Sequence, residues 1–179
     1  SVGIYDVLFN KFFIEELAWT GEQIGAARTL GMWTGGAVGL LVGVGVSFYG
    51  SRYLLLGFVF LELLLYLFLG TADVELIASN GFLILLGVDI AVVGSQVIMF
   101  ALLMSLCVTR TSATNFGIFM GLANFSTLIG NQIAPMSFAA FGYAGSFILG
   151  SIILIPCLFI IPSMTRSNEK ELELLTETD

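Results

Sequence analysis

Long apolar stretches, separated only by short polar turns, limit the folds available to this chain more than any other feature of its sequence. A membrane-spanning helix needs about 20 mostly apolar residues, and five stretches reach that length. A sixth stretch, nearest the N-terminus, is more polar, and we expect its start to be missing. The expected helices cover residues 2–17, 23–48, 53–70, 79–107, 113–139 and 144–164. They predict an all-α, polytopic membrane protein with a bundle over residues 1–165 and an acidic, hydrophilic tail over residues 166–179.

The composition narrows the class of function. Hydrophobic residues make up 58% of the chain and charged residues 11%, whereas soluble domains carry about 25% charge. Lysine and arginine total six and form no patch, so a nucleic-acid partner is not expected. The chain has no histidine, and Cys107 and Cys157 are lone residues in apolar surroundings. We therefore predict no metal site, no cofactor and no catalytic residue, which means that the protein is not an enzyme.

Charged residues outside the apolar stretches predict the orientation. The bases in alternate loops and in the tail are Arg52, Arg110, Arg166 and Lys170. The acids of the opposite loops are Glu15, Glu16, Glu22, Asp73 and Glu75. Because positive residues favour the cytoplasmic side, we expect a multi-pass membrane protein with its C-terminus in the cytoplasm. Lys11 and Arg28 depart from this pattern, since both are expected near the outer ends of their helices.

Four glycines recur at every fourth position of the second expected helix. Gly31, Gly35, Gly39 and Gly43 therefore form one bare ridge, against which another backbone can approach closely. The ridge is typical of simple helix packing, and a sliding contact between moving helices is the alternative.

Asp89 is an acid in a long apolar stretch, and a charge near the membrane centre costs roughly 2.5–3.5 kcal/mol. Gln96 lies two turns further on, so the two side chains share one face. They fit one wall of a water-filled cavity, or else Asp89 is protonated and hydrogen-bonded to a neighbouring helix. Arg28 and Trp33 are expected near the outer end of the second helix. Arg28 either pairs with Asp89 or extends its charged end to the membrane interface.

Three further helices bring polar side chains into the apolar bundle. Glu62 is the other deep acid, and we favour Arg110 over Arg52 as its partner. In the first helix Asp6 aligns with Asn10 at four-residue spacing. In the stretch 113–139 the polar residues are Asn115, Asn124, Thr127 and Asn131. The amides of the three asparagines either hydrogen-bond between helices or face a solute. Several helices that each carry polar groups indicate a solute pathway.

At this point the sequence resembles the C-terminal, six-helix half of a major facilitator superfamily transporter. The superfamily's loop motif falls on "GVGVSFYGSR", where Gly43, Gly50 and Arg52 match and Ser47 replaces the aspartate. The resemblance implies that Gly50 and Arg52 belong to a gate loop. It also implies a partner, an N-terminal half of six helices, and makes this chain a fragment.

A closer resemblance is to muropeptide permeases of the AmpG type, which are grouped with acetyl-CoA transporters. The block from Ser112 to Phe116 in "ALLMSLCVTRTSATNFGIF" is similar to the stretch between that family's tenth and eleventh helices. "ARTLGMWTGGAVGLLVG", with Arg28 in the basic position, resembles the start of its eighth helix. "FIEELAWTGEQIG" and "FGYAGSF" resemble the loop before the eighth helix and the start of the twelfth. Thr127 stands near the position where the family carries an arginine.

The resemblance implies a permease of the bacterial inner membrane that imports an anhydromuropeptide by symport with protons. Without histidine, a carboxylate must carry the proton, and Asp89 is the first candidate, followed by Glu62 and Asp6. The expected partners are thus a small solute, protons and the lipid bilayer. The alternatives are a non-transporting membrane subunit or scaffold, or a facilitator for a sugar, a nucleotide or a drug.

Overall fold

The computed structural model describes the backbone of residues 2–105 and 112–176, and the side chains of residues 7–104 and 113–162. The described backbone is helical almost throughout and contains no strand. The helices are α1 (Val2–Glu15), α2 (Gly21–Tyr49), α3 (Ser51–Thr71), α4 (Val74–Ser105) and α5 (Ser112–Thr176). The side chains of Asp6, Cys107, Arg110, Arg166 and Lys170 lie outside the described part.

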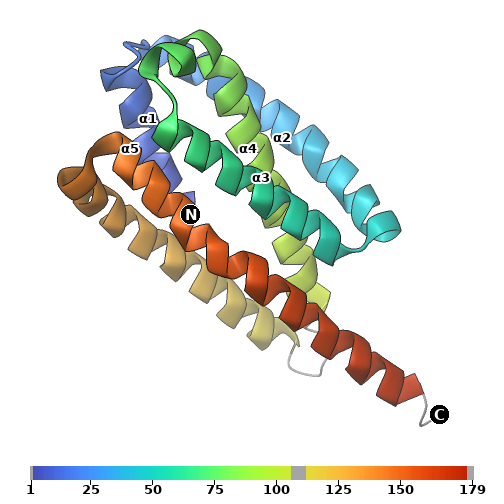
Figure 1. Cartoon of the computed structure of the whole chain (residues 1–179). Coiled ribbons are helices and arrows are strands. Elements are labelled where there is room, and N and C mark those ends of the chain that lie inside the picture. The colour runs from blue at the N-terminus through green and yellow to red at the C-terminus, as the bar shows by residue number, and fades with distance from the viewer. Residues whose placement is uncertain (1, 106–111, 177–179) are drawn as a thin grey trace.

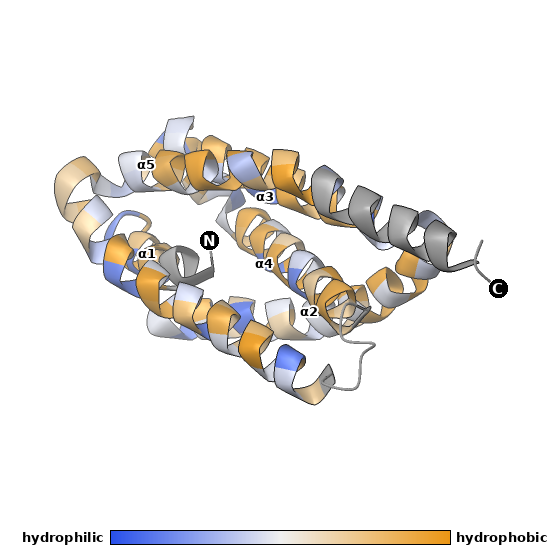
Figure 2. Ribbon diagram, turned by 90° about the horizontal axis from the view of Figure 1, so that it is seen from below, coloured by the Kyte–Doolittle hydropathy of each residue, from blue (hydrophilic) through white to orange (hydrophobic). Residues whose placement is uncertain are grey.

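Four of the described helices are long and apolar enough to cross a membrane: α2, α3, α4 as far as Met104, and α5 from Ala113 to Pro162. Many of their large apolar side chains point outward, as Met32, Leu40 and Phe48 do with exposed fractions of 80%, 78% and 80%. Figure 2 shows that hydrophobic residues occupy much of the length of these helices. A bilayer covers such surfaces, whereas soluble monomers rarely expose apolar patches of this extent. The prediction of an all-helical fold suited to a membrane is confirmed.

The connections between helices are shorter than the sequence suggested. Gly50 alone separates α2 from α3, and its φ of 78° is one that glycine adopts without strain. Thr20 caps α2 by accepting a hydrogen bond from the Gln23 backbone, while the Gln23 side chain accepts one from the Thr20 backbone. Only Ala72 and Asp73 lie between α3 and α4. The short connections place neighbouring helices side by side in opposite directions.

The last two expected helices, 113–139 and 144–164, are joined in one element. Helix α5 extends from Ser112 to Thr176, and its backbone leaves the helical region of φ and ψ at Gly142. Figure 1 shows that the chain reverses there, so that the two arms of α5 lie next to each other. We expected six separate helices, and the described chain has five, the fifth of which reverses. The tail expected from residue 166 continues the helix as far as Thr176.

Gly142 makes this reversal possible because its φ of 67° and ψ of −167° fall in a region open almost only to glycine. Gly142→Ala is expected to lower the free energy of unfolding by about 1–2 kcal/mol. The measurement is loss of helicity against denaturant in detergent micelles. Gly117→Ala is the control, because a Cβ at Gly117 in the same helix meets nothing within 4 Å. Equal stability of the two variants would contradict the role given to Gly142.

The pairing of the helices follows from close contacts. Helix α2 lies along α4 in the same direction, since a Cβ on Gly35 would meet Val93 and one on Gly39 would meet Val97. Helix α3 packs on the other side of α4, and the second arm of α5 packs on α3. Helix α1 packs on α5 through aromatic rings, with Phe12 against Tyr143 at 5.3 Å and against Phe147 at 5.5 Å between centroids. These contacts set α1, α2 and α4 around one polar cluster.

Candidate functional site: a charged cluster shared by three helices

Arg28 and Asp89, the two charged residues that the sequence singled out in α2 and α4, form an ion pair. The Nη1 atom of Arg28 donates to Oδ1 of Asp89 at 2.9 Å. The side chains are 25% and 11% exposed, respectively. Of the two alternatives for Arg28, the structure shows pairing with Asp89 and not extension to the interface.

Asn10 of α1 also belongs to this cluster. The Nη2 atom of Arg28 donates to Oδ1 of Asn10 at 3.1 Å, so one guanidinium group holds side chains from α1 and α4. We call Asn10, Arg28 and Asp89 the Arg28 cluster. The sequence had marked Asn10 only as a polar residue in line with Asp6. Its signal was an amide within the apolar run "DVLFNKFF", but no spacing rule links residue 10 to residue 28.

The glycine ridge of α2 explains how Asp89 reaches Arg28. A Cβ at Gly31 would lie 2.1 Å from Oδ2 and 3.1 Å from Cγ of Asp89, so the carboxylate occupies the space that a side chain would fill. Gly35 and Gly39 continue the contact along α4, whereas a Cβ at Gly43 meets nothing within 4 Å. Three of the four predicted glycines therefore serve the packing of α2 on α4, and Gly43 does not.

The described neighbours of Asp89 along α4 are apolar. Val88, Ala91 and Val92, which flank Asp89 on α4, are at most 7% exposed. Arg28 lies seven residues past the start of α2, which is about 10 Å along the helix. A charge at such a place is costly unless it is paired or reaches water. The ion pair with Arg28 therefore explains how an apolar helix accommodates Asp89.

The other predicted members of the site lie at different points of the bundle. Gln96 is half-buried on α4, two turns beyond Asp89. Trp33 is 78% exposed, so it does not face the bundle as Arg28 does. Asn115 is half-buried and Asn124 exposed on the first arm of α5. The side chain of Asp6 lies outside the described part. Among the described side chains, the Arg28 cluster unites two predicted site residues, Arg28 and Asp89, with Asn10.

Glu62 is buried on α3, away from the Arg28 cluster. It is 2% exposed on α3, between Phe58, which contacts Gly94 of α4, and Tyr66, which contacts Gly150 of α5. Arg110, its favoured partner, falls outside the described residues. The other expected partner, Arg52, lies in the first turn of α3, with its guanidinium carbon 5.8 Å from the centre of the Tyr53 ring. Glu62 therefore belongs to the contact among α3, α4 and α5.

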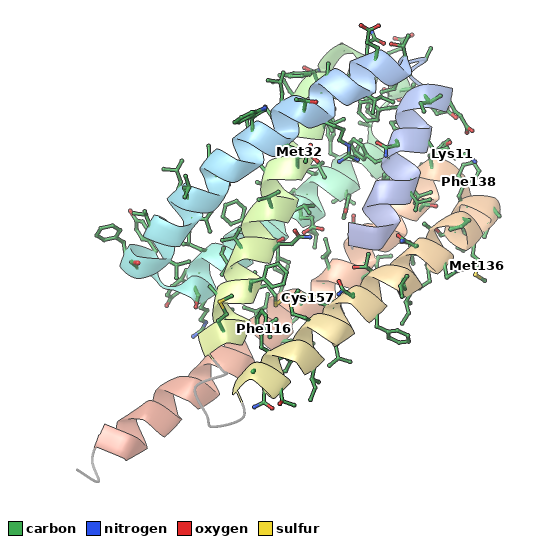
Figure 3. All side chains as sticks on the ribbon, turned by 180° about the vertical axis from the view of Figure 1, so that it is seen from behind. Lys11, Met32, Phe116, Met136, Phe138 and Cys157 are labelled. Atoms are coloured by element: carbon green, nitrogen blue, oxygen red, sulfur yellow. The ribbon has the colours of Figure 1, made fainter. Side chains whose placement is uncertain are left out.

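A second set of polar contacts joins α1 to α5 next to Gly142, where α5 reverses direction. The hydroxyl of Tyr143 donates to Oε2 of Glu15, and Lys11 Nζ lies 3.7 Å from Oε1 of the same carboxylate. Lys11 also lies 4.0 Å from the centre of the Phe138 ring, and Figure 3 shows these two side chains next to each other. No sequence pattern indicated the contact with Tyr143, because it joins residues far apart in the chain. It stabilises α1 in the position from which Asn10 meets Arg28.

Comparison of this chain with protein-family models, with curated proteins and with solved structures finds no match. The chemistry of the site therefore follows from its own residues. Within the described part of the chain, no three His, Cys, Asp or Glu side chains gather in a way that could hold a metal ion. What the Arg28 cluster offers is a cation on α2 whose guanidinium group donates hydrogen bonds to a carboxylate of α4 and to an amide of α1.

Proposed function

We propose that the protein is a proton-coupled secondary transporter of the major facilitator type, in which this chain supplies the C-terminal half. The solute that the resemblance implies is an anhydromuropeptide, taken up across the bacterial inner membrane. A second half of six helices would complete the transporter, and the C-terminus would lie in the cytoplasm. Transport would follow from rocking of the two halves about a site near the membrane midplane.

The ion pair between Arg28 and Asp89 is the observation that carries this proposal. Ionisable residues inside membrane helices are costly, and they typically mark the path of an ion or a solute. Here the pair comes from two helices, and a third contributes Asn10. A secondary transporter alternates between two conformations that bind its solute differently. An ion pair between two helices can differ between those conformations if the helices move.

The arrangement of charges at the two ends of the bundle supports the orientation. Figure 1 places the junctions α1–α2 and α3–α4 at one end and the α2–α3 turn at the other. The first end carries Glu15, Glu22 and Asp73, and the second carries Arg52. A positive cytoplasmic end is the usual orientation.

The decisive experiment is proton-driven uptake of labelled anhydromuropeptide into membrane vesicles that contain the complete transporter. Asp89→Asn is expected to abolish proton-driven accumulation, because the amide keeps the shape of the carboxyl group but cannot carry the proton. Glu75→Gln is the matched control, since Glu75 is an exposed acid at the start of the same helix and is expected to leave uptake unchanged.

The other outcomes select among the alternatives. Full uptake by Asp89→Asn would make the pair a link between helices, as in a scaffold or a non-transporting subunit. No uptake by either the unaltered protein or the Asp89→Asn variant, with both inserted and folded, would remove the anhydromuropeptide from the proposal.

A further inference from the structure

Asn10 and Lys11 are consecutive residues of α1 that contact different neighbouring helices. Oδ1 of Asn10 accepts a hydrogen bond from Nη2 of Arg28 on α2 at 3.1 Å. Lys11 Nζ lies 4.0 Å from the centre of the Phe138 ring on α5, and Figure 3 shows these two side chains together. Successive side chains of a helix point about 100° apart around its axis, so α1 reaches α2 from one side and α5 from another. The distance between Asn10 and Arg28 therefore depends on where α1 lies between these two helices.

Packing on α5 fixes the place of α1. Phe12 is 4% exposed, and its ring lies 5.5 Å from the Phe147 ring and 5.3 Å from the Tyr143 ring of α5. The hydroxyl of Tyr143 also donates to Glu15 at the C-terminal end of α1. Buried aromatic pairs combine a large apolar area with a preferred ring geometry, so they resist displacement. Asn10 therefore extends towards α2 from a firmly packed helix.

The guanidinium group of Arg28 has acceptors from two helices on its two terminal nitrogens. Nη1 donates to Asp89 at 2.9 Å and Nη2 donates to Asn10 at 3.1 Å. Because the group is planar and the directions of its N–H bonds are fixed, it cannot rotate about the Cζ–Nε bond without lengthening these hydrogen bonds. The amide of Asn10 carries no charge, so it restrains the direction of the group without changing the charge of the ion pair.

We infer that Asn10 is a positioning residue for the ion pair: it restrains the plane of the Arg28 guanidinium group, so that Nη1 stays aligned with Asp89. The inference rests on the proposed function and adds a way in which the position of α1 acts on the site. A displacement of α1 away from α2 would lengthen the hydrogen bond at Nη2, and the guanidinium group would then turn more freely. In this role Asn10 acts through Arg28 and need not touch the solute.

Exchange between the two terminal nitrogens of Arg28 measures this restraint directly. Rotation about the Cζ–Nε bond interchanges Nη1 and Nη2, and their two signals in nuclear magnetic resonance spectra merge as the rotation becomes faster. The sample is the full chain in detergent micelles, with isotope-labelled nitrogen in its arginines. The chain has four arginines, and Arg28→Lys removes one set of signals and thereby assigns Arg28.

Asn10→Leu is expected to raise the exchange rate about tenfold, because a hydrogen bond to a charged group is lost while a side chain of similar shape remains. Asn10→Asp is expected to keep the slow exchange, since it retains an acceptor oxygen at the same place. Asn80→Leu is the matched control and is expected to change nothing, because the Asn80 amide is exposed on α4 and donates to the Leu76 carbonyl of its own helix. Circular dichroism confirms that each variant retains its helices.

Uptake of labelled anhydromuropeptide by vesicles that contain the complete transporter shows whether the restraint serves transport. Asn10→Leu is expected to lower the maximal rate of proton-driven uptake about tenfold, in line with the loss of the same hydrogen bond. Asn10→Asp and Asn80→Leu are expected to take up the solute at close to the rate of the unaltered transporter. A residue that only filled space would not distinguish leucine from aspartate in this way.

The results can overturn the inference without affecting the proposed function. Exchange that is as slow in Asn10→Leu as in the unaltered chain, or as fast in Asn10→Asp as in Asn10→Leu, would exclude the positioning role. Normal uptake by Asn10→Leu despite fast exchange would exclude its part in transport. Uptake by the unaltered transporter alongside any of these results would leave the transporter standing. Fast exchange in Asn10→Leu without uptake by the unaltered transporter would instead retain the restraint on Arg28 and exclude the transport function.

Discussion

Arg28→Met is expected to lower the free energy of unfolding by about 3–5 kcal/mol, because it leaves the Asp89 carboxylate buried without its cation. Methionine retains much of the length of the arginine side chain, so the loss comes from the charge and its hydrogen bonds and not from a cavity. The measurement is the loss of helicity across a denaturant series, with the protein in detergent micelles. Asp89→Asn is expected to cost less, since it leaves a neutral amide beside Arg28.

The double variant Arg28→Met with Asp89→Asn tests whether this cost belongs to the pair. With both charges gone, position 89 no longer carries a carboxylate, so the double variant is expected to be more stable than the sum of the single effects predicts. The expected coupling is on the order of 1–3 kcal/mol, as for other residues in direct contact. Additive effects would show that Arg28 and Asp89 contribute to stability independently, which contradicts the contact at 2.9 Å.

Gly31→Ala is expected to cost about 2–3 kcal/mol, near the upper end of the range for an added methyl group in a packed interior. The new Cβ would lie 2.1 Å from Oδ2 of Asp89, so the carboxylate has to leave its position against α2. It would lose its alignment with Arg28, and proton-driven uptake is expected to fall with stability. Unfolding in micelles and uptake into vesicles measure the two effects.

Gly36→Ala is the control for this prediction. A Cβ at Gly36 on the same helix meets nothing within 4 Å, and alanine is favoured over glycine in a helix by up to about 1 kcal/mol. This variant is therefore expected to be as stable as the unaltered protein or slightly more so. A second test places Gly31→Ala in an Asp89→Ala background, where the colliding atoms are absent and the cost is expected to disappear. A cost that remains there would mean that Gly31 acts through some other contact.

The sequence singled out Arg28 and Asp89 as charged residues in apolar stretches but left their relationship open. Arg28 and Asp89 stood out because charges in apolar stretches are costly, and that cost is a property of each stretch by itself. Whether Arg28 pairs with Asp89 depends on the side-by-side packing of α2 and α4, and the two residues lie 61 positions apart in the chain. Only the fold shows that Gly31 brings the two helices close enough.

The roles of Asn10 and Tyr143 were harder to predict from the sequence, because they too depend on how the helices pack. Neither residue carries a charge, and each gains its role from a partner far along the chain, Arg28 for Asn10 and Glu15 for Tyr143. Hydrogen bonds of this kind follow no spacing within a helix, since the spacing rules describe only neighbours on one element. The aromatic contacts of Phe12 with Tyr143 and Phe147 likewise depend on how α1 meets α5.

The sequence by itself determined that the chain is helical and apolar enough for a membrane, because both properties arise from local composition over about 20 residues. It also located the turns at Gly50 and near Gly142, since glycine marks positions where the backbone leaves the helix. The tertiary structure alone decided that Arg28 meets both Asp89 and Asn10, that three of the four ridge glycines contact α4 and that Trp33 points away from the cluster. Helix packing sets these contacts through the combined shape of several surfaces, and no single stretch of sequence contains that information.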